Sequence, residues 1–277
     1  MTLTGRNTCF KTGIVLAALC AFLVLTFSFE LIPAYSSMDA EILRRPDGLF
    51  QVFVSQFLKT SLYAVHTALA AAVLYSLVAI IMIYYSFEQT QAPEILFIAF
   101  FSVSLSFEAA RLILPLYLIH DVSPFYLRML SRTLLFGRFF GIFSLFAASI
   151  YASGLDVQKT RTTIMVIIIA VLIITLGIPV DVQTWDSSLN LVTGFTPFFR
   201  FIEAVVILFT VISFFIGGNT RGSKEYTVIS IGALLALTGR NILIGADTWV
   251  SLSPGILLLS AGTWFMCTRL HRIYLWL

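Results

Sequence analysis

Ionisable side chains occur inside several stretches of sequence that are otherwise strongly apolar. Such residues are costly in hydrocarbon unless they are paired or hydrated, so they mark sites of function or of structural pairing. A spacing of three places Glu108 and Arg111 on one helix face, where they can pair. The same spacing relates Arg200 to Glu203. The further polar residues that we assign to this group are Arg138, Arg240 and Asn241.

The arginines in this group predict a binding site for negative charge. Guanidinium groups bind carboxylates and phosphates through paired hydrogen bonds. Four arginines against two glutamates leave a surplus of positive charge, which predicts a cavity for an anionic or polar small molecule or a lipid head group. Arg111 and Arg240 are the expected ligand contacts, and the two glutamates orient them. The alternative is an internal network of ion pairs, with the remaining arginines extending to lipid phosphates.

The other residue types indicate neither catalysis nor a metal site. The three histidines, His66, His120 and His271, do not converge in the expected topology, as a metal site would require. The three cysteines lack the spacing of a zinc site or a disulfide framework. Protease motifs and phosphate-binding loops are missing, and no basic run suggests nucleic acid. We therefore expect a non-catalytic protein without a cofactor or metal.

The composition is that of an integral membrane protein. Hydrophobic residues make up 59% of the 277 residues and charged residues only 11%, whereas soluble domains carry about 25% charged residues. Apolar stretches near 20 residues recur, and this length spans the bilayer. The pattern predicts an all-α polytopic protein of about eight transmembrane helices. The expected ranges are about 13–29, 62–85, 95–118, 132–153, 162–180, 199–217, 226–245 and 253–271.

Basic residues in the connections predict the orientation of these helices. Cytoplasmic loops carry an excess of lysine and arginine. Four basic pairs fall on one side of an eight-helix topology, which predicts that both termini are cytoplasmic; they are Arg6 with Lys11, Lys159 with Arg161, Arg221 with Lys224, and Arg269 with Arg272. The charged residues within the spans then belong to the outer half of the membrane.

The chain is expected to have two parts. Residues 1–61 form an N-terminal anchor helix and an extracytoplasmic segment, and residues 62–277 form a seven-helix bundle. The first apolar stretch also resembles a signal sequence, but no convincing cleavage site follows, so we expect a retained anchor. Within the extracytoplasmic segment, the polar residues Gln51, Ser55 and Lys59 recur every fourth position, which predicts a helix lying in the membrane interface.

Three local signals predict how individual helices begin, bend and pack. Gly137 and Gly141 have the GxxxG spacing that permits close helix approach. Pro115 is expected to kink the third helix near its outer end. Ser253 and Pro254 are expected to start the eighth helix, as an N-cap followed by proline in the first turn.

Three segments resemble the seven-helix sensor module found at the N-terminus of some bacterial histidine kinases. They are FIAFFSVSLSFEAARLILP, YLRMLSRTLLFGRFFGIFSLFAASIYASG and IGALLALTGRNILIGADTWVSLSPGILLLSAGTWFMCTRLHRIYLW. The resemblance implies that the outer half senses a ligand or a membrane state and that the last helix transmits the change. It also implies a bacterial cytoplasmic membrane. No kinase follows Leu277, so output is expected to need a separate cytoplasmic signalling partner.

We therefore predict a sensor or receptor-like membrane protein in which the seven polar residues line an outward-facing cavity. Two alternatives use the same residues differently. In the first, a transporter or lipid-handling protein holds an anionic head group with these arginines. In the second, the charges serve assembly of the chain as a structural subunit of a larger membrane complex.

Overall fold

Helices dominate the computed structural model, which describes residues 3–42, 59–120 and 123–275. Within these ranges, eight helical spans are long and apolar enough to cross a membrane, which confirms the predicted all-α polytopic fold. The helices are α1 (Leu3–Ile42), α3 (Leu62–Phe87), α4 (Pro93–Ser104), α5 (Ile113–His120), α6 (Pro124–Ala152), α7 (Thr160–Gly177), α8 (Thr196–Thr220), α9 (Lys224–Ile244) and α10 (Trp249–Leu275).

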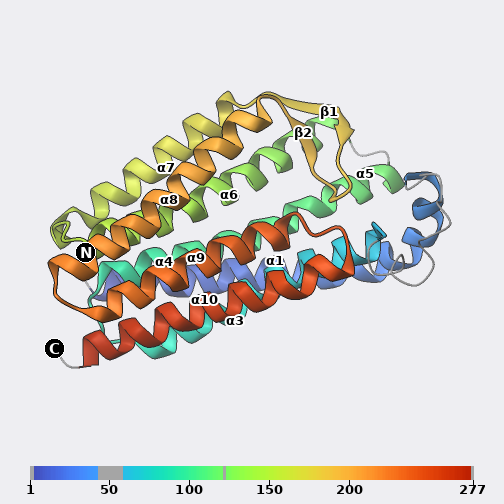
Figure 1. Ribbon diagram of the computed structural model, residues 1–277. Helices are drawn as coiled ribbons and strands as arrows, with labels where there is room; N and C mark the ends of the chain where they lie inside the picture. The colour runs from blue at the N-terminus through green and yellow to red at the C-terminus, as the bar shows by residue number, and fades with distance from the viewer. Residues whose placement is uncertain (1–2, 43–58, 121–122, 276–277) are drawn as a thin grey trace, which may run out of the picture.

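The two ends of the bundle differ in structure. Figure 1 shows both chain termini at one end, which we call the termini end. At the opposite end, the strands β1 (Val180–Trp185) and β2 (Leu191–Thr193) form an antiparallel hairpin, so we call it the hairpin end. The hairpin corrects the expectation of a helix to residue 180, because α7 already ends at Gly177. The assignment of the termini end to the cytoplasm stays a prediction.

The third span is not one continuous α-helix. Between α4 and α5 the chain forms a 3₁₀-helix, η1 (Leu105–Leu112), of eight residues. Runs longer than three or four residues are uncommon in this conformation and often mark a hinge or strain. Pro115 follows within α5, and because it has no N–H it cannot bond to the carbonyl of Arg111. The irregular geometry therefore precedes the proline and carries both Glu108 and Arg111.

Helices α9 and α10 run side by side (Figure 1), and their backbones approach each other closely. A Cβ atom added to Gly239 would meet the backbone of Leu259, and one added to Gly262 would meet the backbone of Ala236. Small residues permit such close approach in membrane proteins. The two helices are therefore held together along most of their length.

The predicted start of the last helix is wrong. Helix α10 begins at Trp249 and includes Pro254, rather than starting at the proline. The preceding Thr248 provides a cap, since its Oγ1 accepts a hydrogen bond of 3.3 Å from the backbone N–H of Ser251. An earlier cap lets the helix form one turn before the proline.

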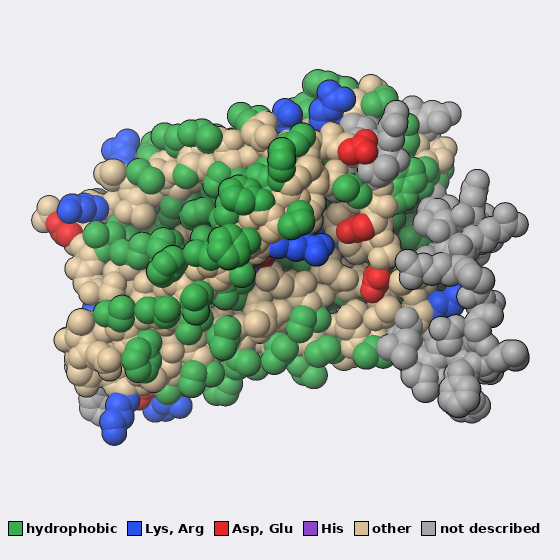
Figure 2. Space-filling view, turned by 45° about the horizontal axis from the view of Figure 1, so that its top comes forward, with side chains coloured by type: hydrophobic (Ala, Val, Ile, Leu, Met, Phe, Trp, Pro, Cys, Tyr) green, Lys and Arg blue, Asp and Glu red, His purple; other side chains and the backbone are tan. Residues whose placement is uncertain are grey.

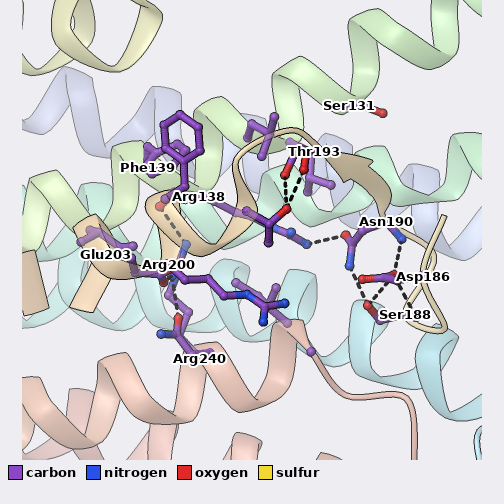
Figure 3. A pocket seen from close by; sticks show the side chains of 18 of the residues that line it. Ser131, Arg138, Phe139, Asp186, Ser188, Asn190, Thr193, Arg200, Glu203 and Arg240 are labelled. Atoms are coloured by element: carbon purple, nitrogen blue, oxygen red, sulfur yellow. Dashed lines mark hydrogen bonds and ion pairs between the residues drawn. The ribbon is translucent and has the colours of Figure 1, made fainter. Parts of the chain in front are cut away.

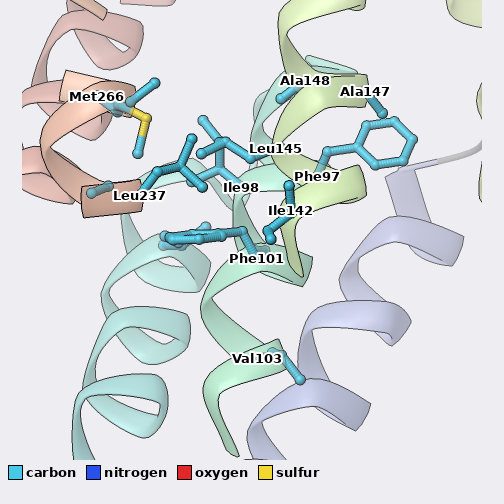
Figure 4. Close-up of a cluster of buried hydrophobic side chains, with 14 of the residues drawn as sticks. Phe97, Ile98, Phe101, Val103, Ile142, Leu145, Ala147, Ala148, Leu237 and Met266 are labelled. Atoms are coloured by element: carbon cyan, nitrogen blue, oxygen red, sulfur yellow. The ribbon is translucent and has the colours of Figure 1, made fainter. Parts of the chain in front are cut away.

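The interior of the bundle is a cluster of buried apolar side chains (Figure 4). Phe97 and Phe101 of α4 lie against Ile142 of α6, and Leu237 of α9 and Met266 of α10 complete this part of the cluster. All five side chains are buried. The core thus joins four spans near the middle of the bundle.

Helix α1 is longer than expected and contributes to the same core. It runs well beyond 13–29 in both directions, packs on α3, and places Phe10 and Ala17 in the main apolar cluster. The division at residue 61 into an anchor and a bundle stays a prediction. The expected interfacial helix lies almost wholly outside the described residues.

The GxxxG spacing does bring helices close together. A Cβ atom at Gly137 would collide with the ring of Phe107, and one at Gly141 would collide with Ser104. Helix α6 therefore approaches α4 and η1 through these two glycines. This contact brings α6 against the 3₁₀ segment that carries the buried charges.

Replacement of Gly141 by leucine should destabilise this contact. Overpacking a close contact costs roughly 1–3 kcal/mol, so the midpoint of thermal unfolding in detergent should fall clearly. Gly177→Ala is the control, because nothing lies within 4 Å of an added Cβ there. Equal midpoints for the two variants would show that α6 does not need the close approach at Gly141.

Candidate binding cavity

A single buried carboxylate joins two arginines at the hairpin end. Glu108 of η1 is only 2% exposed. Its two oxygens accept hydrogen bonds from Nε and Nη2 of Arg138 on α6, at 2.7 and 2.8 Å. Arg111 lies one turn along from Glu108 and pairs with it at 3.5 Å, as the spacing of three predicted. The two-point contact between Arg138 and Glu108 is the strong form of an arginine–carboxylate pair.

Arg111 connects three elements rather than facing open space. Its Nη1 donates a 3.2 Å hydrogen bond to the carbonyl of Ile244 at the end of α9, and its Nη2 donates to the carbonyl of Ser188 in the hairpin turn. The side chain is 2% exposed, and its Nε has no partner in the described part of the chain. Arg111 therefore holds the hairpin and α9 against η1.

Arg240 has the same role between α6, α8 and α9. Its Nη1 donates to Glu203 at 3.3 Å and to the side-chain oxygen of Asn241 at 2.9 Å. Its Nη2 donates at 2.7 Å to the backbone carbonyl of Arg138. Glu203 thus pairs with Arg240, although the spacing suggested Arg200. The buried cation offers a stronger attraction than the exposed one because the surrounding dielectric constant is lower.

The hairpin turn adds Asp186 to the polar residues of this end. From the sequence we expected Asp186 only to lie in an outer loop. Oδ1 of Asp186 accepts hydrogen bonds from the N–H and Oγ of Ser188 and from the N–H of Asn190, at 2.9–3.1 Å. The side-chain oxygen of Asn190 accepts a 2.8 Å bond from Arg138. Between them, Leu189 has a φ of 58°, which is rare for a residue with a side chain. The run of Asp, Ser and Asn was the sequence signal for this turn.

These residues surround a cavity of about 620 Å³ between α6, α8, α9 and the hairpin (Figure 3). Five of the seven predicted residues line it, while Glu108 and Arg111 are not in the lining and support it through Arg138 and the hairpin. The lining members of the predicted set are Arg138, Arg200, Glu203, Arg240 and Asn241.

The charge of this site is nearly balanced apart from one guanidinium. Asp186 also lines the cavity, so the site holds three acids against four arginines. The prediction from the sequence included only Glu108 and Glu203. Arg200 is exposed and forms no ion pair with any described residue. The side chain of Arg138 is 19% exposed, and its hydrogen bonds to described side chains use Nε and Nη2 but not Nη1. Figure 3 shows both side chains together in the cavity.

The histidines lie elsewhere and are engaged by neighbouring side chains. Both ring nitrogens of His66 lie within hydrogen-bond distance of hydroxyls, Ser28 at 2.7 Å and Tyr35 at 3.0 Å. His120 contacts Glu30 at 2.5 Å near the surface. The described residues contain no group of three or more His, Cys, Asp or Glu that could hold a metal ion.

Comparison with known proteins identifies one distant similarity. The chain is 23% identical, over an alignment of 344 residues that covers all of both chains, to an uncharacterized protein of Treponema pallidum (strain Nichols). No protein-family model matches the chain, and no solved structure matches it.

Replacement of Glu108 by glutamine should destabilise the whole hairpin end. The change leaves the buried guanidinium of Arg111 and the partly buried one of Arg138 without their counter-charge, and loss of one partner of a buried pair typically costs about 3–5 kcal/mol. The free energy of unfolding, measured by denaturant titration in detergent, is the readout. Glu30→Gln is the matched control, since its pair with His120 is about half exposed and worth less than about 1 kcal/mol. Similar losses in both variants would contradict a central role for Glu108.

Proposed function

We propose that this integral membrane protein is a non-catalytic receptor that binds an anionic group in the cavity at its hairpin end. The observation that carries the proposal is Arg200, an unpaired guanidinium in a cavity whose other charges are largely neutralised. Burial of a ligand anion beside Arg200 would complete the charge balance of the site. The Nη1 group of Arg138, which is not used in the hydrogen bonds to Glu108 and Asn190, offers a second donor to the same anion.

The roles that we propose differ from those expected from the sequence. Arg200 and Arg138 contact the ligand, because these two have donors free to do so. Arg111 and Arg240 are engaged in hydrogen bonds that link helices, so they hold the cavity in shape. Direct contact of Arg111 or Arg240 with a ligand stays an untested prediction.

The apolar interior supports binding rather than transport. Beyond the cavity, toward the termini end, buried side chains of α4, α6, α9 and α10 fill the bundle (Figure 4). An anion crossing this region would lose its hydration without gaining a partner. The buried ionisable residues Arg6 and Glu94 lie near the starts of α1 and α4, at the termini end of the bundle, whereas the cavity lies at the hairpin end.

The packing of α9 on α10 offers a path for output. Arg240 of α9 lines the cavity and bonds to the backbone of α6, and the glycine contacts hold α9 against α10. At the termini end, Arg269 of α10 pairs with Glu225 of α9 at 2.9 Å. A shift of α9 on binding would therefore move α10, whose end would meet a separate signalling partner. The resemblance to the histidine-kinase sensor module supports this output and a bacterial cytoplasmic membrane location.

Arg200→Gln should weaken stabilisation by anions. A ligand that binds the native state raises its stability by mass action, so we would record thermal unfolding against a panel of phosphates, sulfates and carboxylates. A charge-assisted hydrogen bond contributes about 1.5–3 kcal/mol, so the dissociation constant of the best ligand should rise at least about tenfold. Arg128→Gln is the matched control, because Arg128 is an exposed arginine of α6 that does not line the cavity.

Two results would contradict the proposal. Equal responses of the two variants would show that the anion binds outside the cavity. Uptake of the bound anion into liposomes that contain the purified protein, above the rate in empty liposomes, would favour the transporter alternative over a receptor.

A further inference from the structure

We infer that the ligand of this cavity is an anionic amphiphile, with a phosphate or carboxylate head and one hydrocarbon chain. This inference rests on the proposed function, because it places the head group at Arg200 and Arg138. It adds a second contact surface, the apolar wall of the same cavity. The wall includes Phe139, Ile142, Ala204 and Ile207.

The deepest part of the cavity along α6 and α8 is apolar. Arg200 is four residues from the start of α8, or about 6 Å at 1.5 Å per residue. Ile207 lies seven residues farther, or about 10 Å deeper. On α6, Ile142 lies one turn beyond Arg138, again toward the termini end. The arginines therefore lie toward the hairpin, and the deepest lining residues of α6 and α8, Ile142 and Ile207, are apolar.

These depths match the layers of a bilayer. The 25 residues of α8 extend about 37 Å, a few ångströms longer at each end than the roughly 30 Å hydrocarbon layer. Arg200 thus lies close to the level of lipid head groups, and Ile207 lies within the hydrocarbon. A small soluble anion would occupy only the part of the cavity nearest the hairpin.

The surface around α8 supports entry from the membrane. Near the start of α8, the rings of Phe195, Phe198 and Phe201 are 58–72% exposed, as expected for a lipid-facing helix. Figure 2 shows acidic and basic side chains gathered on the flank of the molecule, bordered by apolar side chains. The charged groups of this flank are therefore reached from beside the bundle, where an amphiphile already lies in the bilayer.

The size of the cavity indicates a small amphiphile. A volume of about 620 Å³ lies in the range of about 300–1,000 Å³ typical of small-molecule sites. The opposing Glu203 and Asp186 leave a net surplus of only one positive charge among the charged groups, which matches a single anionic head.

The test compares inorganic phosphate with butyl, octyl and dodecyl phosphate, using the full chain in detergent and thermal unfolding and native mass spectrometry as readouts. Wild-type protein should bind more tightly as the chain lengthens, by up to about fourfold for each buried CH₂ group. Ala204→Phe should fill the apolar wall and weaken dodecyl phosphate at least tenfold, a larger loss than for inorganic phosphate. Leu208→Phe is the control, because Leu208 is exposed and outside the cavity lining.

The outcomes separate this inference from the proposed function. If all four phosphates bind equally and Ala204→Phe changes none of them, the ligand is a small soluble anion and the inference is wrong, although the receptor proposal stands. If Arg200→Gln leaves dodecyl phosphate binding intact, or none of the phosphates and carboxylates binds, both fail. Should Ala204→Phe unfold at a lower temperature without ligand, the milder Ala204→Leu gives the same comparison.

Discussion

The buried carboxylate of Glu108 is the contact on which the hairpin end depends. It accepts a two-point hydrogen bond from Arg138 and pairs with Arg111, so one acid neutralises cations from two spans. In a low-dielectric interior the buried Arg111 could not remain charged and unpaired at acceptable cost, and Arg138 is also mostly shielded from solvent. Through Arg111 the same carboxylate positions Ser188 of the hairpin turn, and through Arg138 it positions Asn190. The cavity wall is therefore built outward from this one group.

The bundle separates rigid packing from polar chemistry. Toward the termini end, aromatic and aliphatic side chains fill the interior. At the hairpin end, helices are joined by guanidinium groups that bond to backbone carbonyls and carboxylates. Such bonds link α6, α8 and α9 around the cavity, since Arg240 of α9 bonds to Glu203 of α8 and to the backbone of α6.

Within the cavity, the distinction between free and engaged arginines decides what can be bound. Arg111 and Arg240 use their donors on protein carbonyls and acids, so a ligand would have to displace existing hydrogen bonds to reach them. Arg200 has no such competitor among the described residues, and Nη1 of Arg138 is not used in the hydrogen bonds to Glu108 and Asn190. Binding at these two groups would cost no internal ion pair, which is the physical basis of the proposed site.

The sequence by itself determined the all-α membrane fold, because stretches of about 20 apolar residues can span a bilayer only as helices. It also determined which polar residues are unusual, including the pairing of Glu108 with Arg111, since both lie on one helix face. Tertiary structure decided the rest. Arg240 pairs with Glu203, 37 residues away in the sequence, and Arg138 bonds to Asn190 of the hairpin, 52 residues away. Helical periodicity carries no information about contacts between such distant segments, so only the fold could show that Arg200 forms no ion pair with the described residues.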